Sequence, residues 1–246
     1  MNDLQPLRND IELHDADSLG ARLARGLDPN ILVDGKNLLE RLVSEYTRSP
    51  RFTRCVKVLL EGGVPTDPVL AALLQDDAQA LRVQLEADEK IIGRKYNFDC
   101  AYTPLREASL LHVCAEFNLT ACGALLLKMG IDVDTPAGVD EWGFGGQTPV
   151  FHTVNQNQHQ SKEMLALLLQ HKCRVDVTVK GLIWGKGYPW ETLVPSVNPI
   201  SYALMGLLPQ MHRNEQTIHQ TVQQLMRHAY GVDHPLFNVP CRYLHG

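Results

Sequence analysis

Two short patterns recur along the chain, and recurrence constrains the fold strongly because an internal repeat defines the architecture that can bury its apolar faces. The first pattern is a leucine-rich segment, then a small turn residue, then an apolar residue and aspartate. It occurs as RLARGLDPN (22–30), VLLEGGVPTD (58–67), LLLKMGIDVD (125–134) and LLLQHKCRVD (167–176). Each copy is typical of a helix end and its following turn.

The second pattern is a helix start. A small polar residue or aspartate, often followed by proline, precedes apolar residues at helical spacing. Such side chains cap free backbone amides, and proline at the first helical position loses no hydrogen bond. The predicted starts are Asn37, Asp67, Ser109, Thr148 and Asn198.

Together the two patterns resemble the ankyrin repeat, whose signature runs TPLHxAA, a second helix ending in LL, then GADVN. Residues 109–134 match best, because SLLHVCAEFN aligns with the first helix and LLLKMGIDVD with the second helix and turn. Thr148 and Pro149 reproduce the TP pair. The predicted starts are 30, 42, 39 and 50 residues apart, unlike the steady repeat of about 33, which places extra residues in the connections.

The resemblance therefore implies an all-α fold: an ankyrin-repeat α-solenoid of about six helix pairs with long inter-repeat loops. We expect residues 1–246 to form a single domain. The predicted repeats are approximately 15–33, 34–66, 67–99, 100–135, 136–177 and 178–231, followed by a C-terminal tail, 232–246.

Composition narrows the class of partner. The formal net charge of −5 gives no reason to expect nucleic acid, and the N-terminus carries acids where a secretory signal would be basic. No apolar run approaches the roughly 20 residues that cross a bilayer. Six cysteines without CxxC spacing indicate reduced thiols inside the cell. The sequence therefore predicts a cytoplasmic protein that binds neither nucleic acid nor membrane.

A binding surface is predicted in the long connections 88–103, 136–147 and 178–197, which hold all three tryptophans. Aromatic side chains are over-represented among binding hot spots, but rings in long loops also pack on one another as a small satellite core. Both interpretations stay open. The loop candidates for partner contact are Trp142, Phe144, Trp184, Tyr188 and Trp190.

The resemblance adds candidates on the first helices, where the position after the signature histidine faces the concave side of the family's fold. His152 and Tyr202 occupy that position, and Glu116 lies one turn beyond it in its own repeat. His112 occupies the histidine position itself, so we expect it to hold backbone groups of the adjoining turn.

No catalytic constellation is evident. His112 and Cys114 are two residues apart on one predicted helix, so their side chains diverge. GLIWGKGYPW lacks the spacing of a phosphate-binding loop, and the histidines show no metal-ligand pattern. Gly145 and Gly146 could expose amides to an anion or simply form a turn with positive φ.

These observations predict a non-enzymatic protein–protein interaction module with no cofactor and no metal. It would bind a protein partner through its concave face and aromatic loops. The alternative is a protein that binds a small molecule or a peptide in a pocket closed by the loops, with weak hydrolytic chemistry from His152.

Overall fold

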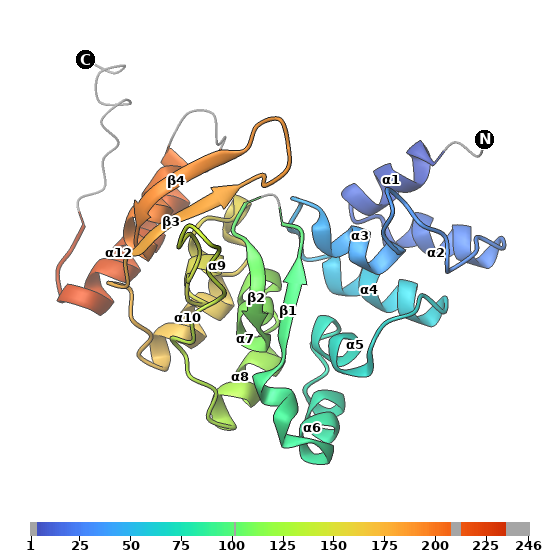
Figure 1. The fold of residues 1–246 in the computed structure, drawn as a ribbon, viewed down its shortest axis with the longest axis horizontal. Helices are drawn as coiled ribbons and strands as arrows, with labels where there is room; N and C mark the ends of the chain where they lie inside the picture. The colour runs from blue at the N-terminus through green and yellow to red at the C-terminus, as the bar shows by residue number, and fades with distance from the viewer. Residues whose placement is uncertain (1–3, 101, 208–212, 235–246) are drawn as a thin grey trace.

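The computed structural model of the chain describes residues 4–100, 102–207 and 213–234. Within them, twelve α-helices form successive antiparallel pairs that run from α1 at one end of the molecule to α12 at the other (Figure 1). The pairs are α1 (Gln5–Glu12) with α2 (Ala16–Ala24), α3 (Leu38–Ser44) with α4 (Phe52–Glu61), α5 (Pro68–Leu74) with α6 (Ala78–Ala87), α7 (Leu110–Phe117) with α8 (Thr120–Lys128), α9 (Phe151–Val154) with α10 (Lys162–Gln170), and α11 (Pro199–Leu204) with α12 (Glu215–Tyr230).

Neighbouring pairs stack in two layers. In the layer of first helices, α1 contacts α3, and α5, α7, α9 and α11 contact one another in succession. In the layer of second helices, α2 contacts α4, and α6, α8 and α10 follow one another. Short 3-10 helices, η1 (Glu89–Gly93), η2 (Asn157–His159) and η3 (Met205–Leu207), lie in the connections.

The predicted helix starts hold at four positions. Ser109 is the N-cap of α7, and at the other three positions a side-chain oxygen caps the helix. Asn37 accepts from the N–H of Glu40 at 2.8 Å, Asp67 caps α5, and Asn198 accepts from the N–H of Ser201 at 2.9 Å. Thr148 differs: α9 begins at Phe151, and no hydrogen bond of the Thr148 hydroxyl is found among the described residues.

The predicted all-α class is wrong, because connections expected to be loops are antiparallel β-hairpins. β1 (Lys95–Phe98) pairs with β2 (Leu105–Ser109), and β3 (Val179–Trp184) pairs with β4 (Thr192–Val197) in continuous register from Gly181↔Pro195 to Trp184↔Thr192. A third, smaller hairpin is closed by the bridge between Val139 and Gly145. The two main hairpins lie on the same side of the helices (Figure 1).

A single apolar core runs through the helix pairs. It includes residues of successive pairs, such as Leu39, Leu42, Val69 and Leu73. The first helix pair begins at Gln5, ahead of the predicted boundary at residue 15, and the predicted tail lies outside the described residues beyond residue 234. No described helix combines the length and the apolarity that a bilayer crossing requires.

Candidate functional site

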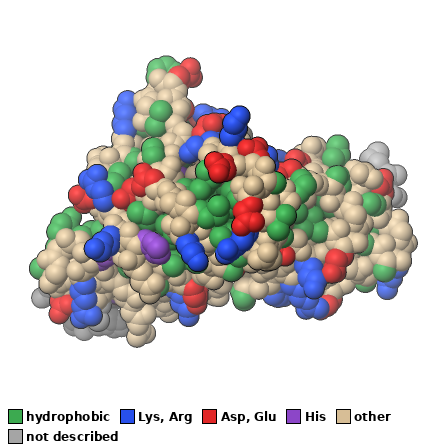
Figure 2. Space-filling model, turned by 90° about the horizontal axis from the view of Figure 1, so that it is seen from below, with side chains coloured by type: hydrophobic (Ala, Val, Ile, Leu, Met, Phe, Trp, Pro, Cys, Tyr) green, Lys and Arg blue, Asp and Glu red, His purple; other side chains and the backbone are tan. Residues whose placement is uncertain are grey.

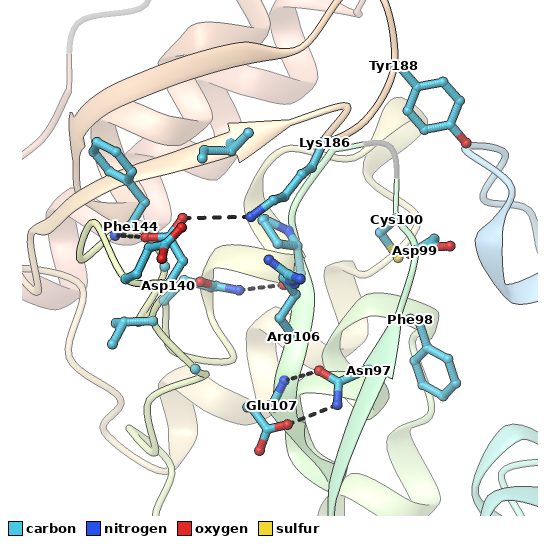
Figure 3. A pocket seen from close by; sticks show the side chains of 17 residues that line it. Asn97, Phe98, Asp99, Cys100, Arg106, Glu107, Asp140, Phe144, Lys186 and Tyr188 are labelled. Carbon is cyan, nitrogen blue, oxygen red and sulfur yellow. Dashed lines mark hydrogen bonds and ion pairs between the residues drawn. The ribbon is translucent and has the colours of Figure 1, made fainter.

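A cleft of about 750 Å³ lies between the three hairpins (Figure 3). Its walls come from β1 and the β1–β2 loop, from β2, from the central hairpin (residues 137–147), and from the end of β3 with the following turn. Volumes of 300–1,000 Å³ are typical of ligand sites. The polar lining residues are Asn97, Asp99, Cys100, Arg106, Glu107, Asp140, Glu141, Gln147 and Lys186.

Backbone hydrogen bonds join the central hairpin to each of the two main hairpins. The N–H of Gly138 donates to the carbonyl of Arg106 in β2 at 3.0 Å, and the N–H of Gly145 donates to the carbonyl of Gly181 in β3 at 2.9 Å. Within the central hairpin, Gly146 donates to Gly138 at 3.1 Å. The walls of the cleft are therefore joined to one another through the central hairpin.

Glycine is required where the central hairpin closes. Gly145 has φ of +109°, and a Cβ atom there would collide with the carbonyl oxygen of Gly138. Gly146 and Gly143 also have positive φ values, +75° and +80°. The prediction of a turn with positive φ at Gly145 and Gly146 is thus confirmed, since only glycine adopts such angles without strain.

Asp140 organises one wall. Its carboxylate accepts hydrogen bonds from the N–H groups of Phe144 at 2.9 Å and Trp142 at 3.0 Å, and the Lys186 ammonium lies 3.9 Å away. The Phe144 N–H is the main cause that lowers the pKa of Asp140, and the Trp142 N–H and Lys186 act in the same direction. On the neighbouring wall, Asn97 donates to Glu107 Oε1 at 2.9 Å (Figure 3).

Gln147 lies at the floor of the cleft and is 1% exposed. Its Nε2 donates to the carbonyl of Pro104, while its own backbone carbonyl accepts from His112 Nε2 at 2.9 Å. Its side-chain oxygen has no hydrogen-bond partner. Buried acceptors are nearly always paired, so this oxygen is an unsatisfied group beneath the cleft.

His112 ties the helix layer to the hairpins. Its Nδ1 accepts from the backbone N–H of Ser109 at 3.2 Å, which leaves the proton on Nε2 to donate to Gln147. Burial, and the nearby His152, lower the pKa of His112 to about 3, so the ring is neutral. The predicted structural role of His112 is confirmed.

Three of the predicted contact residues are exposed in the turns of the hairpins, and Tyr188 is the one of the three that lines the cleft. Trp142 is 66% exposed, Tyr188 48% and Trp190 45%. The Trp190 ring lies 5.4 Å from that of Tyr188 and stacks on it, whereas Trp142 has no ring partner among the described residues. Phe144 is half-buried beneath the Lys180 ammonium, which lies 5.1 Å from the ring centre.

The other four predicted contact residues are buried, so they cannot present their side chains to a broad protein surface. Trp184 Nε1 donates to the Tyr202 hydroxyl at 2.8 Å, and the Tyr202 hydroxyl also bonds with Thr103 Oγ1 at 2.8 Å. Tyr102 packs edge-on against Trp184 at 5.4 Å. These rings pack on one another, so the satellite-core interpretation holds for them. The hairpins cover the face of the first helices that was expected to be a groove.

Glu116 and His152 belong to a buried charged cluster. Glu116 accepts from Arg48 Nε at 2.7 Å and lies 2.8 Å from His152 Nδ1. Burial by itself would raise the pKa of Glu116, but Arg48 and the His152 hydrogen bond outweigh it and lower the pKa. Arg48 also bonds Cys100 Sγ at 3.6 Å, and burial raises the pKa of that thiol to about 12. The geometry is that of a structural ion-pair cluster.

The five described cysteines are free, and burial raises the pKa of each thiol above its ordinary value. Residues 4–100, 102–207 and 213–234 contain no group of three or more His, Cys, Asp or Glu side chains placed to hold a metal. Acidic and basic side chains are interspersed over the face shown in Figure 2, with apolar side chains exposed between them.

Sequence reasoning missed the polar residues of the cleft because it treated their segments as loops. Arg106 and Glu107 lie on β2, Gln147 on the central hairpin and Lys186 in the turn after β3. The alternation of Tyr96 and Phe98 with polar residues, and the Val-, Ile- and Trp-containing run of β3, are strand signals that would have found the hairpins.

The fold and the cleft define a stack of helix pairs that carries β-hairpins on one side. No known protein-family profile matches the chain, and no curated protein matches it. Among solved structures the chain is similar to the crystal structure of the human ASB11 ankyrin repeat domain. The two are 15% identical, the match covers 88% of this chain and 97% of that one, and the TM-score is 0.35. A similarity this weak does not by itself define a family or a function.

Proposed function

We propose that the chain is a non-enzymatic interaction module that receives a segment of a partner protein in the cleft between its hairpins. The observation that carries the proposal is the cleft itself, whose walls are joined by backbone hydrogen bonds. A preformed site loses little conformational freedom on binding. The free thiols of the described cysteines support a reducing, cytoplasmic setting.

Exposed aromatic side chains beside the cleft support a protein partner. Trp142 rises from the central hairpin, and Tyr188 lines the cleft from the turn after β3. Rings of this kind supply large contact area at low entropic cost. Trp184 is not among the contact residues proposed here, because it is buried and hydrogen-bonded.

Site-specific photo-cross-linking tests the proposal. p-Benzoylphenylalanine placed at position 142 or 188 should cross-link the same protein in a lysate of the source cells. Val83 provides the matched control, because it is 53% exposed on α6 and does not line the cleft. The proposal fails if position 83 captures the same protein as readily, or if neither position 142 nor position 188 captures any protein.

A small-molecule ligand is the second candidate function, since the volume of the cleft also suits a metabolite. A thermal-shift screen against metabolites separates the two. A single compound that raises the melting temperature by several degrees would favour the small molecule, if positions 142 and 188 also cross-link no protein.

A further inference from the structure

We infer that the cleft recognises a cationic side chain of the partner segment, arginine above all. This inference rests on the proposed function and names the chemistry of the occupant. Two independent features of the cleft carry it: an unpaired acceptor beneath the floor and an excess of carboxylates along the walls.

An acceptor without a donor lies beneath the floor of the cleft. The Gln147 amide is held in one orientation because its Nε2 donates to the Pro104 carbonyl, which can only accept. Its Oε1 is buried and unpaired. The floor therefore carries an uncompensated negative dipole, which favours a positive group above it and disfavours a carboxylate or phosphate.

The walls carry more negative than positive charge. Four carboxylates line the cleft, Asp99, Glu107, Asp140 and Glu141, against two cations, Arg106 and Lys186. Lys186 is already matched with Asp140, and Asp99 pairs with Lys36 at 2.8 Å.

Two of the carboxylates remain without a cationic partner among the described ion pairs. The Glu107 carboxylate accepts from the neutral Asn97 amide, and the Glu107 backbone N–H donates to Asn97 Oδ1. Glu141 is exposed. Set against one remaining cation of the lining, they leave the cleft one carboxylate in excess. The single opposing charge is Arg106, which lies between Lys186 and Glu107 in Figure 3.

Arginine fits this lining better than lysine. A guanidinium presents five N–H donors in a plane, so it can serve two carboxylates at once, whereas an ammonium acts as a point charge. The apolar lining side chains Val139, Phe144 and Ile183 can cover the aliphatic stem of the incoming residue.

The test is a ¹H–¹⁵N NMR titration of the whole chain with Nα-acetyl-arginine methylamide, its citrulline counterpart and its glutamate counterpart. The citrulline derivative keeps the shape and removes the charge. We expect saturable shifts of the Gln147 side-chain amide and of the Gly138 and Gly145 backbone amides with the arginine derivative. The citrulline derivative should bind at least tenfold more weakly and the glutamate derivative should cause no shift.

The double variant Glu107→Gln with Glu141→Gln should weaken binding of the arginine derivative at least fivefold. Glu86→Gln is the matched control, because Glu86 is exposed on α6 away from the cleft. Equal binding of arginine and citrulline, stronger binding of glutamate, or no shift with any probe overturns the inference. Cross-linking from positions 142 and 188 would still stand in those cases, so the failure of the inference is distinguishable from that of the proposed function.

Discussion

At the scale of single residues, the buried Glu116 carboxylate is the group on which the inner polar cluster depends. It holds both Arg48 and His152, and the side chains of Arg48 and Glu116 are each 8% exposed. Removing one partner of a buried ion pair leaves the other charge uncompensated, which costs about 3–5 kcal/mol, whereas exposed pairs contribute about 0–1 kcal/mol.

Glu116→Gln is therefore expected to lower the free energy of unfolding by about 3 kcal/mol, measured by urea denaturation. Asp17→Asn breaks the exposed pair with Arg54 and serves as the control, with an expected change below about 1 kcal/mol. If the two substitutions lower the free energy of unfolding equally, the Glu116 cluster does not stabilise the fold more than an exposed ion pair does.

At the scale of elements, the central hairpin depends on a glycine where it closes. Gly145 combines a positive φ with the close approach of the Gly138 carbonyl, while Gly187 has φ of +86° with no atom within 4 Å of an added Cβ. Gly145→Ala should thus lower the free energy of unfolding by more than about 2 kcal/mol and reduce cross-linking from position 142. Gly187→Ala should cost about 1 kcal/mol and leave cross-linking intact. The measurements are urea denaturation and cross-linking yield.

The helices and the hairpins also differ in how far the sequence predicts them. Helix starts carry local signals, so Asn37, Asp67 and Asn198 could be identified from their own side chains and the residues that follow. Strand pairing is set by contacts between distant residues. Short strands such as β1 carry only a weak alternation of apolar and polar residues, and the repeat pattern led us to interpret them as connections. Thr148 shows the limit of the local signal, because its helix begins three residues later.

At the scale of the whole molecule, the hairpins change what the helix stack can present. Prediction of contact residues on the first helices assumed an open face, yet Tyr202 is fully buried beneath Thr103 and Trp184, which come from two different hairpins. The exposed rings Trp142, Tyr188 and Trp190 could be predicted from residue type and loop length. The charged cleft could not, because it exists only where three segments distant in sequence meet.

Two buried histidines, His14 and His112, make the stability of the whole molecule dependent on pH. Burial, followed by Arg48 and Arg51, lowers the pKa of His14 from 6.5 to about 4, and burial lowers that of His112 to about 3. Both rings stay neutral in the folded chain at pH 5, whereas an unfolded chain protonates them near pH 6.5. The unfolded state therefore binds more protons as the pH falls below 6.5, and the folded state loses stability down to about pH 4.

The expected loss approaches about 1.4 kcal/mol per pH unit for each of the two histidines once the pH is well below 6.5. Urea denaturation at pH 7.5, 6.5, 5.5 and 4.5 measures the slope. His14→Gln should make that slope shallower by removing one titrating group while His112 continues to contribute. A slope that His14→Gln leaves unchanged, or stability that rises toward pH 5, would mean that these rings are reached by protons in the folded chain.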